Sequence, residues 1–482
     1  HPRVRRQRQM CIRDRAKGVQ MMTLSHAQFK DLDERKFKLW SKKLAKNPSY
    51  PCPISSVYDA YPVEIEKRKN GAKTEYVISI DNESEPVPLT KEELTALMGA
   101  PRIPEIIYRY TRYHLGATVE FLKQCDGIYG MSLMETDEMK TVIDTLAREA
   151  QRPDVHKYMS YQGEPILRKA FADWYKKWYR TELDFKSEVL PLIGSKEGIM
   201  HICMTFLNKG DKVLVPNPGY PTYSAAVRLA GGEMVTYALN KETNFYPDFA
   251  AIEKAGLDGV KMMLINYPNM PTGQTPTMEL FQQIVDFGAK HNILIVHDNP
   301  YSFIRNAAAP ISIMEAEGAR DVALEMNSLS KGHSMAGWRV GVVVGKKEWI
   351  DSILTFKSNM DSGMFYPIQA AADTALALGE EWFKELNDIY YGREKQAYAL
   401  LDALGCKYRE HQAGLFVWAE LPESYEGDSF AFSDEVMDKC DVFLTPGGIF
   451  GSEGKRYIRI TLCCPEELLK KATENIKAKF GK

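Results

Sequence analysis

Seven short apolar runs follow one another along the middle of this chain, with helical patterns between several of them. The runs cover residues 189–193, 212–215, 233–237, 261–265, 293–296, 323–329 and 340–344. Such runs are typical of buried strands, and their alternation with helices predicts an α/β fold. After about residue 357 the pattern changes to helices with short strands near 415–418 and 456–462, which predicts a smaller C-terminal domain.

The composition is that of a large globular protein and argues against two classes of partner. The chain has 482 residues, of which 44% are hydrophobic, and 62 basic side chains stand against 64 acidic ones. A nearly balanced charge provides no electrostatic drive toward nucleic acid or a membrane surface. The eight cysteines include no C-x-x-C pair, so we expect reduced thiols and a cytoplasmic location.

The first quarter of the chain differs from the rest. Residues 1–20 carry seven basic side chains and one acidic one, which predicts a disordered or non-native basic leader. Residues 21–125 form an extension of unknown role, with a helix expected over 29–44 and a strand over 75–80. Two further helices are expected over 90–98 and 103–122. Because a glycine separates them, a helix-turn-helix stays open as an interpretation.

Lys331 is the strongest candidate for chemistry. It lies in the run SLSKGHSMAGWRVG, residues 328–341. A lysine with its ordinary pKa of about 10.4 is a poor nucleophile at neutral pH, so a catalytic lysine needs a carbonyl partner and a lowered pKa. Pyridoxal 5′-phosphate supplies such a carbonyl. Ser328 and Arg339 could provide a hydroxyl and a guanidinium for its phosphate.

Two other stretches could complete such a site. Asp298 follows the apolar run 293–296, and a carboxylate at the end of a parallel strand points into a crevice, where it could keep a pyridine nitrogen protonated. An aspartate before Asn299 and Pro300 also suits a turn, and we expect both roles. Gly194, Ser195 and Lys196 follow another run as a tight turn and helix start, whose free backbone N–H groups could hold a phosphate.

Arg459 is the candidate for substrate binding. It lies among apolar neighbours in the alternating strand 457–462. An arginine that points inward needs an anion, and its planar fork suits a carboxylate.

These stretches, in this order, resemble the class I/II aminotransferases, which are pyridoxal-phosphate enzymes of fold type I. The resemblance spans roughly residue 127 to the end and implies a seven-stranded, mostly parallel sheet. It places the sheet in a large cofactor-binding domain over 126–356, including an entry segment 126–160, and an α+β small domain over 357–482.

The resemblance also implies roles for single residues. Lys331 and Asp298 would act in catalysis together with Tyr301, which would donate to the phenolic oxygen of the cofactor ring. Tyr220 would stack on the ring, and Arg459 would hold the substrate's α-carboxylate. Tyr158 would reach the phosphate of the neighbouring subunit, so that the active sites are shared in a homodimer. No metal site is expected.

One position departs from the family pattern. In the run NYPNMPTG, residues 266–273, the family usually has an asparagine where this chain has Met270. A thioether cannot donate a hydrogen bond. Tyr301 would then serve the ring oxygen alone, unless Asn269 shifts to help.

The resemblance implies a ping-pong aminotransferase that moves an amino group between an amino acid and a 2-oxo acid through an aldimine of Lys331. Two alternatives stay open. The same set of residues serves lyases and decarboxylases on this fold. A regulator that senses pyridoxal phosphate through an N-terminal helix-turn-helix is the other.

Overall fold

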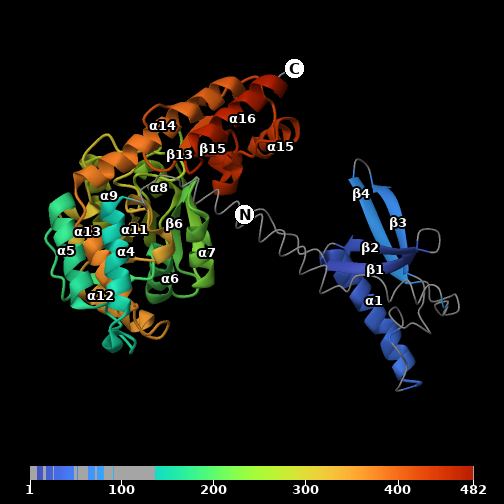
Figure 1. Ribbon diagram of the computed structural model, residues 1–482, viewed down its shortest axis with the longest axis horizontal. Coiled ribbons are helices and arrows are strands. Elements are labelled where there is room, and N and C mark those ends of the chain that lie inside the picture. Colours follow the sequence, from blue (N-terminus) through green and yellow to red (C-terminus); the bar gives the residue numbers. More distant parts are fainter. Residues whose placement is uncertain are drawn as a thin grey trace. The chain divides into compact units, whose positions relative to one another are not determined.

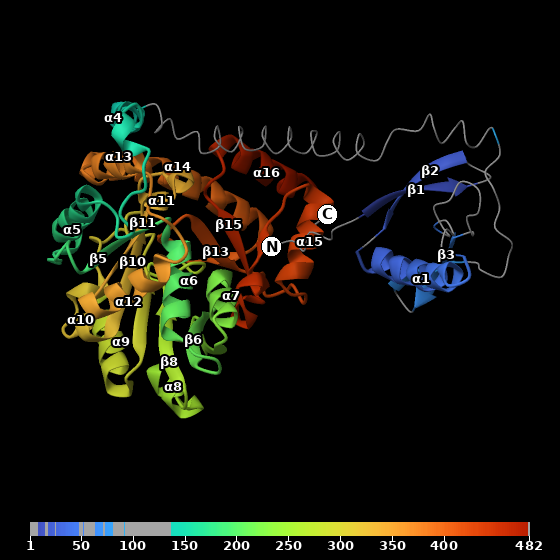
Figure 2. The same cartoon turned by 90° about the horizontal axis from the view of Figure 1, so that it is seen from below.

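The computed structural model describes residues 8–14, 18–24, 26–47, 52, 63–70, 73–80, 91 and 136–480. The chain divides into two compact units, residues 1–121 and residues 122–482. Both units appear in two views in Figure 1 and Figure 2.

The second unit is built on a seven-stranded sheet with the strand order β5-β11-β10-β9-β8-β6-β7. Its strands are β5 (Val189–Leu192), β6 (Lys212–Asn217), β7 (Glu233–Ala238), β8 (Val260–Ile265), β9 (Leu294–Asp298), β10 (Ala323–Ser328) and β11 (Gly341–Val344). The five strands from β10 to β7 are parallel, whereas β11 runs antiparallel to both β10 and β5. The seven expected strands and the mostly parallel α/β fold are therefore confirmed.

Apart from the edge strand β7, whose residues are mostly exposed, this sheet is buried on both faces, which explains why the other strands are largely apolar. Successive residues of a strand point to opposite faces, and in β5 Val189 belongs to one apolar cluster while Leu190 and Leu192 belong to another. Helices cover the sheet in both views (Figures 1 and 2). They include α5 (Pro165–Tyr179), α6 (Ser195–Phe206), α7 (Pro221–Leu229), α8 (Phe249–Ala255), α9 (Met278–His291), α10 (Ala319–Val322), α12 (Lys347–Lys357) and α13 (Tyr366–Leu376). A further helix, α4 (Asp137–Ala150), packs against α13.

A smaller sheet follows near the C-terminus. Its order is β12-β13-β15-β14, formed by β12 (Lys407–Tyr408), β13 (Phe416–Glu420), β14 (Thr445–Pro446) and β15 (Tyr457–Thr461). The accompanying helices are α14 (Glu380–Leu404), α15 (Ser429–Cys440) and α16 (Glu466–Lys479), and α14 lies beside α16 in both views (Figures 1 and 2). The two strands expected here are present, and the proposed boundary at residue 357 stays a prediction.

In its described residues, the first unit contains two hairpins and one long helix. The hairpins join β1 (Arg8–Asp14) to β2 (Gly18–Leu24) and β3 (Val63–Asn70) to β4 (Lys73–Ile80). The paired strands β1 and β2 differ from the disordered leader expected over 1–20. The boundary at residue 20 and the non-native origin of the leader stay predictions.

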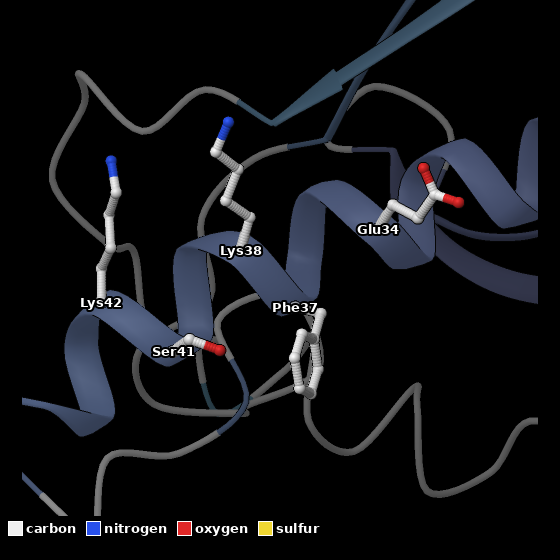
Figure 3. Close-up of a pocket in the computed structure, with 5 residues that line it drawn as sticks. All are labelled: Glu34, Phe37, Lys38, Ser41 and Lys42. Atoms are coloured by element: carbon white, nitrogen blue, oxygen red, sulfur yellow. The ribbon is translucent and has the colours of Figure 1, made fainter.

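The helix of the first unit is α1 (His26–Leu44), which confirms the helix expected there. Its outer surface carries a pocket lined by Glu34, Phe37, Lys38, Ser41 and Lys42 (Figure 3). No expected site residue lines this pocket. The helices expected over 90–98 and 103–122 lie outside the described residues, apart from Lys91. Within the described parts, no helix has the length and apolar character needed to cross a bilayer.

Candidate active site

The expected catalytic residues meet at one edge of the large sheet. Asp298 is the last residue of β9, and Lys331 lies in the short helix α11 (Leu329–Gly332) that directly follows β10. Strands β9 and β10 are parallel, and their register pairs Asp298 with Met326. Because the carboxyl ends of parallel strands share one edge, the fold brings the two residues to the same crevice.

The surroundings of Lys331 favour a neutral amine. Burial lowers the pKa of this lysine, and the positive charges of Arg339 and Arg459 lower it further, whereas a thiolate at Cys463 would raise it. A neutral amine is the nucleophilic form. Cys463 therefore belongs to the wall of this site, although no motif in the sequence marked it.

Asp298 has one satisfied and one unsatisfied oxygen. Its Oδ2 accepts a hydrogen bond of 2.9 Å from the Tyr223 hydroxyl, while Oδ1 is buried and has no partner among the described residues. Burial raises the pKa of this carboxyl to about 6, against the lowering effects of the Tyr223 hydrogen bond and of His297. A buried carboxylate oxygen without a donor fits the protonated ring nitrogen of pyridoxal phosphate.

Tyr223 was not among the predicted residues. It lies in the first turn of α7, three residues after Tyr220, and the two rings meet edge to face at 5.6 Å between centroids. The sequence offered one indication of Tyr223, namely its position one helical turn after the expected stacking residue Tyr220. Its partner Asp298 is 75 residues away in the sequence, so the contact itself could not be foreseen.

Tyr301 is buried beside Asp298 and keeps its proton. Burial and the negative charge of Asp298 raise its pKa well above the ordinary value. Its ring packs edge to face against Phe416 at 6.4 Å between centroids. A protonated hydroxyl here can donate a hydrogen bond, which is the role implied for Tyr301.

The turn before α6 is shaped by contact with Arg339. Gly194 caps the helix with a φ of 82°. A Cβ at this position would lie 2.0 Å from Nη2 of Arg339, so only glycine lets the guanidinium lie against the turn. Ser195 and Lys196 open α6 directly after it. The guanidinium and the free N–H groups of the helix start form a cradle that fits a phosphate.

Ser328 has a local structural role. Its hydroxyl donates to the carbonyl oxygen of Val340 at 3.1 Å and accepts from the N–H of Ser330 at 3.1 Å. The Ser330 hydroxyl in turn accepts from Arg339 at 3.4 Å, and Arg339 also donates to Ala336 O at 2.9 Å. Ser330, which the sequence analysis did not select, therefore contacts Arg339 directly.

Arg459 lies in β15 as a partly buried cation between two aromatic rings. Its Cζ atom is 3.8 Å from the ring centroid of Phe416 and 4.6 Å from that of Phe450. Burial lowers its pKa to about 10, so the side chain is still charged at neutral pH. Within the described chain its Nε atom is buried without a hydrogen-bond partner. A partly buried cation with a buried, unused donor atom fits an anionic substrate group.

Met270 fills the position of the family asparagine and contacts Arg459. Its Sδ atom lies 3.4 Å from Nη1 of the arginine. The structure commits Asn269 elsewhere: its Nδ2 donates to Asn266 O at 3.1 Å, and its Oδ1 accepts from the Thr272 hydroxyl at 2.7 Å. These bonds hold the loop and use one of the two N–H donors of the amide, so a contribution of Asn269 to the ring oxygen stays a prediction.

Tyr158 lies on the surface of its unit. It is 87% exposed and precedes α5. A role at the phosphate of a neighbouring subunit requires an accessible side chain, so the exposure agrees with that prediction without testing it.

A separate polar cluster resembles a metal site but already contains a cation. Glu197, His201 and Asp361 bring one possible ligand atom each within 4.8 Å of one another. Both carboxylate oxygens of Asp361 lie 2.8 Å from Nζ of the buried Lys357. Since this ammonium already neutralises the carboxylate, we assign no metal to the cluster.

The fold and these residues together define a pyridoxal-phosphate-dependent transferase of fold type I. The sequence matches the family described as aminotransferase class I and II over residues 129–476. The chain belongs to this family. The comparisons thus favour neither a lyase or decarboxylase nor a transcription regulator.

Two curated relatives are named for the same activity. The chain is 43% identical over 333 residues to the LL-diaminopimelate aminotransferase of Dehalococcoides mccartyi, covering 69% of this chain and 85% of the relative. It is 40% identical over 339 residues to the enzyme of that name from Aquifex aeolicus, covering 70% of this chain and 87% of the relative.

Solved structures agree with the fold. Substrate-bound BacF from Bacillus subtilis aligns with a TM-score of 0.67 at 36% identity, covering 70% of this chain and 86% of that chain. An aminotransferase from Staphylococcus aureus aligns with a TM-score of 0.66 at 32% identity, covering 70% and 89%.

Proposed function

We propose that this aminotransferase takes LL-diaminopimelate as its amino donor and a 2-oxo acid as its acceptor. The donor proposal is supported by the activity for which relatives 40–43% identical to this chain are named. The observation that carries the assignment of the site is the pair of unused buried atoms, Asp298 Oδ1 and Arg459 Nε. One suits a ring N–H and the other a carboxylate, and both lie in the same crevice as Lys331.

The proposed roles follow from these contacts. Bound pyridoxal 5′-phosphate would supply the electron sink that stabilises a carbanion at the substrate's α-carbon. Arg459 would hold the α-carboxylate, and the neutral amine of Lys331 would take the α-proton and return it. Asp298 would hold the ring nitrogen proton, and Tyr301 would donate to the ring oxygen. The phosphate would lie against Gly194, Ser195, Lys196, Ser328 and Arg339, with Tyr220 stacked on the ring.

A donor panel tests the substrate. Purified enzyme with 2-oxoglutarate is assayed with LL-diaminopimelate, meso-diaminopimelate, lysine, alanine and phenylalanine, and glutamate formation is measured. We expect the highest kcat/KM with LL-diaminopimelate. A monoamino acid that exceeds it would refute the donor proposal while leaving the enzyme class intact. Release of ammonia or pyruvate without glutamate would indicate lyase chemistry instead.

Variants test the assigned roles. Lys331→Ala should abolish turnover while the phosphate cradle still retains the cofactor. Arg459→Lys keeps the positive charge but loses the bidentate fork, so it should raise KM for the amino donor about tenfold or more. An Arg459→Lys enzyme with unchanged KM would remove this arginine from the substrate site.

We also propose a homodimer whose two active sites each take Tyr158 from the other subunit. The exposure of Tyr158 supports this arrangement. Lys331→Ala and Tyr158→Phe chains, each impaired alone, are coexpressed with different tags and the mixed dimers isolated. If the sites are shared, the mixed dimer contains one site in which both altered residues lie together and one that is fully native, so activity reappears. Mixed dimers as inactive as both parents, or a monomer in sedimentation, would contradict the proposal.

A further inference from the structure

A fully buried histidine and glutamate lie side by side directly behind the catalytic carboxylate. His297 in β9 and Glu325 in β10 are cross-strand partners, and both are completely inaccessible to solvent. Nδ1 of His297 is 2.8 Å from Oε2 of Glu325. His297 immediately precedes Asp298, and the steps assigned to the active site make no use of the pair.

The surroundings of Glu325 favour its ionised form. Oε1 accepts hydrogen bonds of 2.9 Å from the hydroxyls of Tyr175 and Ser312. Oε2 accepts a third, of 3.1 Å, from the N–H of Ile313. Donors that converge on a carboxylate stabilise its charge. A buried carboxylate also needs a cation, and His297 is the basic side chain in contact with it among the described residues.

The contacts of His297 favour a proton on each ring nitrogen. Nε2 lies 2.8 Å from the carbonyl oxygen of Tyr267, an atom that can only accept. The N–H of Tyr267 is also near, at 3.3 Å, and would suit an unprotonated Nε2. The carbonyl is the closer of the two, and a bare nitrogen at 2.8 Å from it would set two lone pairs against each other. With Nε2 protonated, Nδ1 needs the second proton to face Glu325.

We propose that Glu325 keeps His297 as a buried imidazolium, and that this positive charge holds Asp298 ionised for the cofactor. His297 and Glu325 are positioning residues, since neither reaches the crevice. The other described groups that act on the Asp298 carboxyl are the uncharged hydroxyls of Tyr223 and Tyr301. His297 is therefore the cation that offsets the burial of Asp298 before the ring nitrogen arrives.

The first test observes the protonation state directly. The full-length enzyme, loaded with pyridoxal 5′-phosphate, is labelled with nitrogen-15 in its histidine rings, and His297 is assigned by comparison with a His297→Gln variant. We expect both ring nitrogens of His297 to give the protonated signal, because the Tyr267 carbonyl and the Glu325 carboxylate each face one of them. One unprotonated ring nitrogen in the native enzyme would overturn the proposal.

The second test removes the charge while preserving the shape. Glu325→Gln should remove the carboxylate that faces His297 and weaken retention of pyridoxal 5′-phosphate about tenfold, a loss of about 1.4 kcal/mol. Tyr175→Phe is the matched control, because it removes a hydrogen bond to Glu325 but leaves both charges, and it should bind the cofactor within about twofold of the native enzyme. Equal weakening in both variants, or none in Glu325→Gln, would contradict the proposal.

Failure of this inference is distinguishable from failure of the proposed substrate. Neither the nitrogen-15 signals nor cofactor retention depends on which amino donor is used. If Glu325→Gln does not fold, as judged by thermal unfolding, the signals of the native enzyme decide alone.

Discussion

Burial shifts the charged groups of this site toward their neutral forms. It lowers the pKa of Lys331 and of Arg459 and raises that of Asp298. These shifts affect the charge at neutral pH differently, because the ordinary pKa values of the three groups differ. Arg459 remains charged at a pKa of about 10, whereas Asp298, at about 6, titrates close to neutral pH. The carboxylate is therefore the group of this site most sensitive to pH and to its neighbours.

The raised pKa of Asp298 predicts how stability depends on pH in the cofactor-free protein. The folded state binds this proton more tightly than the unfolded chain, whose ordinary value is 3.8. The resulting stabilisation is complete below that value and is lost as the pH rises through about 6. Asp298→Asn, which cannot ionise, should exceed the native protein in unfolding free energy by about 3 kcal/mol at pH 8.

Chemical denaturation of both proteins at pH 8 and at pH 4, without cofactor, measures this difference. At pH 4 most of it should disappear, because Asp298 is then protonated in the folded native protein. A difference of equal size at both pH values would mean that burial of the charge is not its cause.

Met270 predicts an altered electronic environment for the cofactor. Without the family asparagine, one hydrogen-bond donor to the ring oxygen is missing. The absorbance change of the Lys331-linked cofactor should therefore have its midpoint at a higher pH in the native enzyme than in Met270→Asn. Met270→Leu, which also lacks a donor, serves as the control and should behave like the native enzyme. A spectrophotometric titration in which all three midpoints coincide would refute this prediction.

At the scale of elements, the site depends on two connections between a strand and a helix. The turn from β5 to α6 supplies the phosphate cradle, and the connection from β10 to α11 presents Lys331. Arg339, which comes after α11 in the chain, lies so close to the first connection that a Cβ at Gly194 would fall 2.0 Å from its Nη2 atom. Gly194 thus serves both the backbone geometry and the position of the guanidinium.

Gly194→Ala tests this close approach. The added methyl group would collide with Arg339 and require alanine to adopt a positive φ. We expect pyridoxal 5′-phosphate to bind about tenfold more weakly or worse, a loss of about 1.4 kcal/mol. Gly337→Ala is a matched control on the same motif, since nothing lies within 4 Å of a Cβ there. Fluorescence titration of the apoenzymes measures both, and equal affinities would show that the cradle tolerates a side chain.

At the scale of the whole molecule, the proposed catalytic residues belong to one unit. All candidate site residues lie within residues 122–482, and the family match begins at residue 129. The first 121 residues form a separate compact unit. The fold of the second unit and its cofactor site should therefore not depend on them.

Removal of residues 1–121 tests this independence. The shortened chain should bind pyridoxal 5′-phosphate with an affinity within about threefold of the full chain, because Asp298, Arg339 and the cradle are retained. Equilibrium dialysis and thermal unfolding compare the two proteins. A shortened chain that unfolds, or one that binds the cofactor much more weakly, would show that the first unit supports the second.

The sequence by itself determined the seven strands and the identity of Lys331, Asp298 and Arg459. Apolar strand runs and a lysine motif are local patterns, so each can be recognised from the residues of its own segment. The same patterns also predicted that β9 and β10 end at the site, because the carboxyl ends of parallel strands lie at one edge of a sheet.

The tertiary structure alone decided which side chains support those residues. Tyr223 donates a hydrogen bond to Asp298, 75 residues away in the sequence. Met270 contacts Arg459, which is 189 residues away in the sequence. The pairing of β9 with β10 sets His297 against Glu325. Such contacts depend on strand register and helix placement, to which every element of the core contributes. A local pattern contains no record of them, and for this reason the supporting residues became visible only in the folded chain.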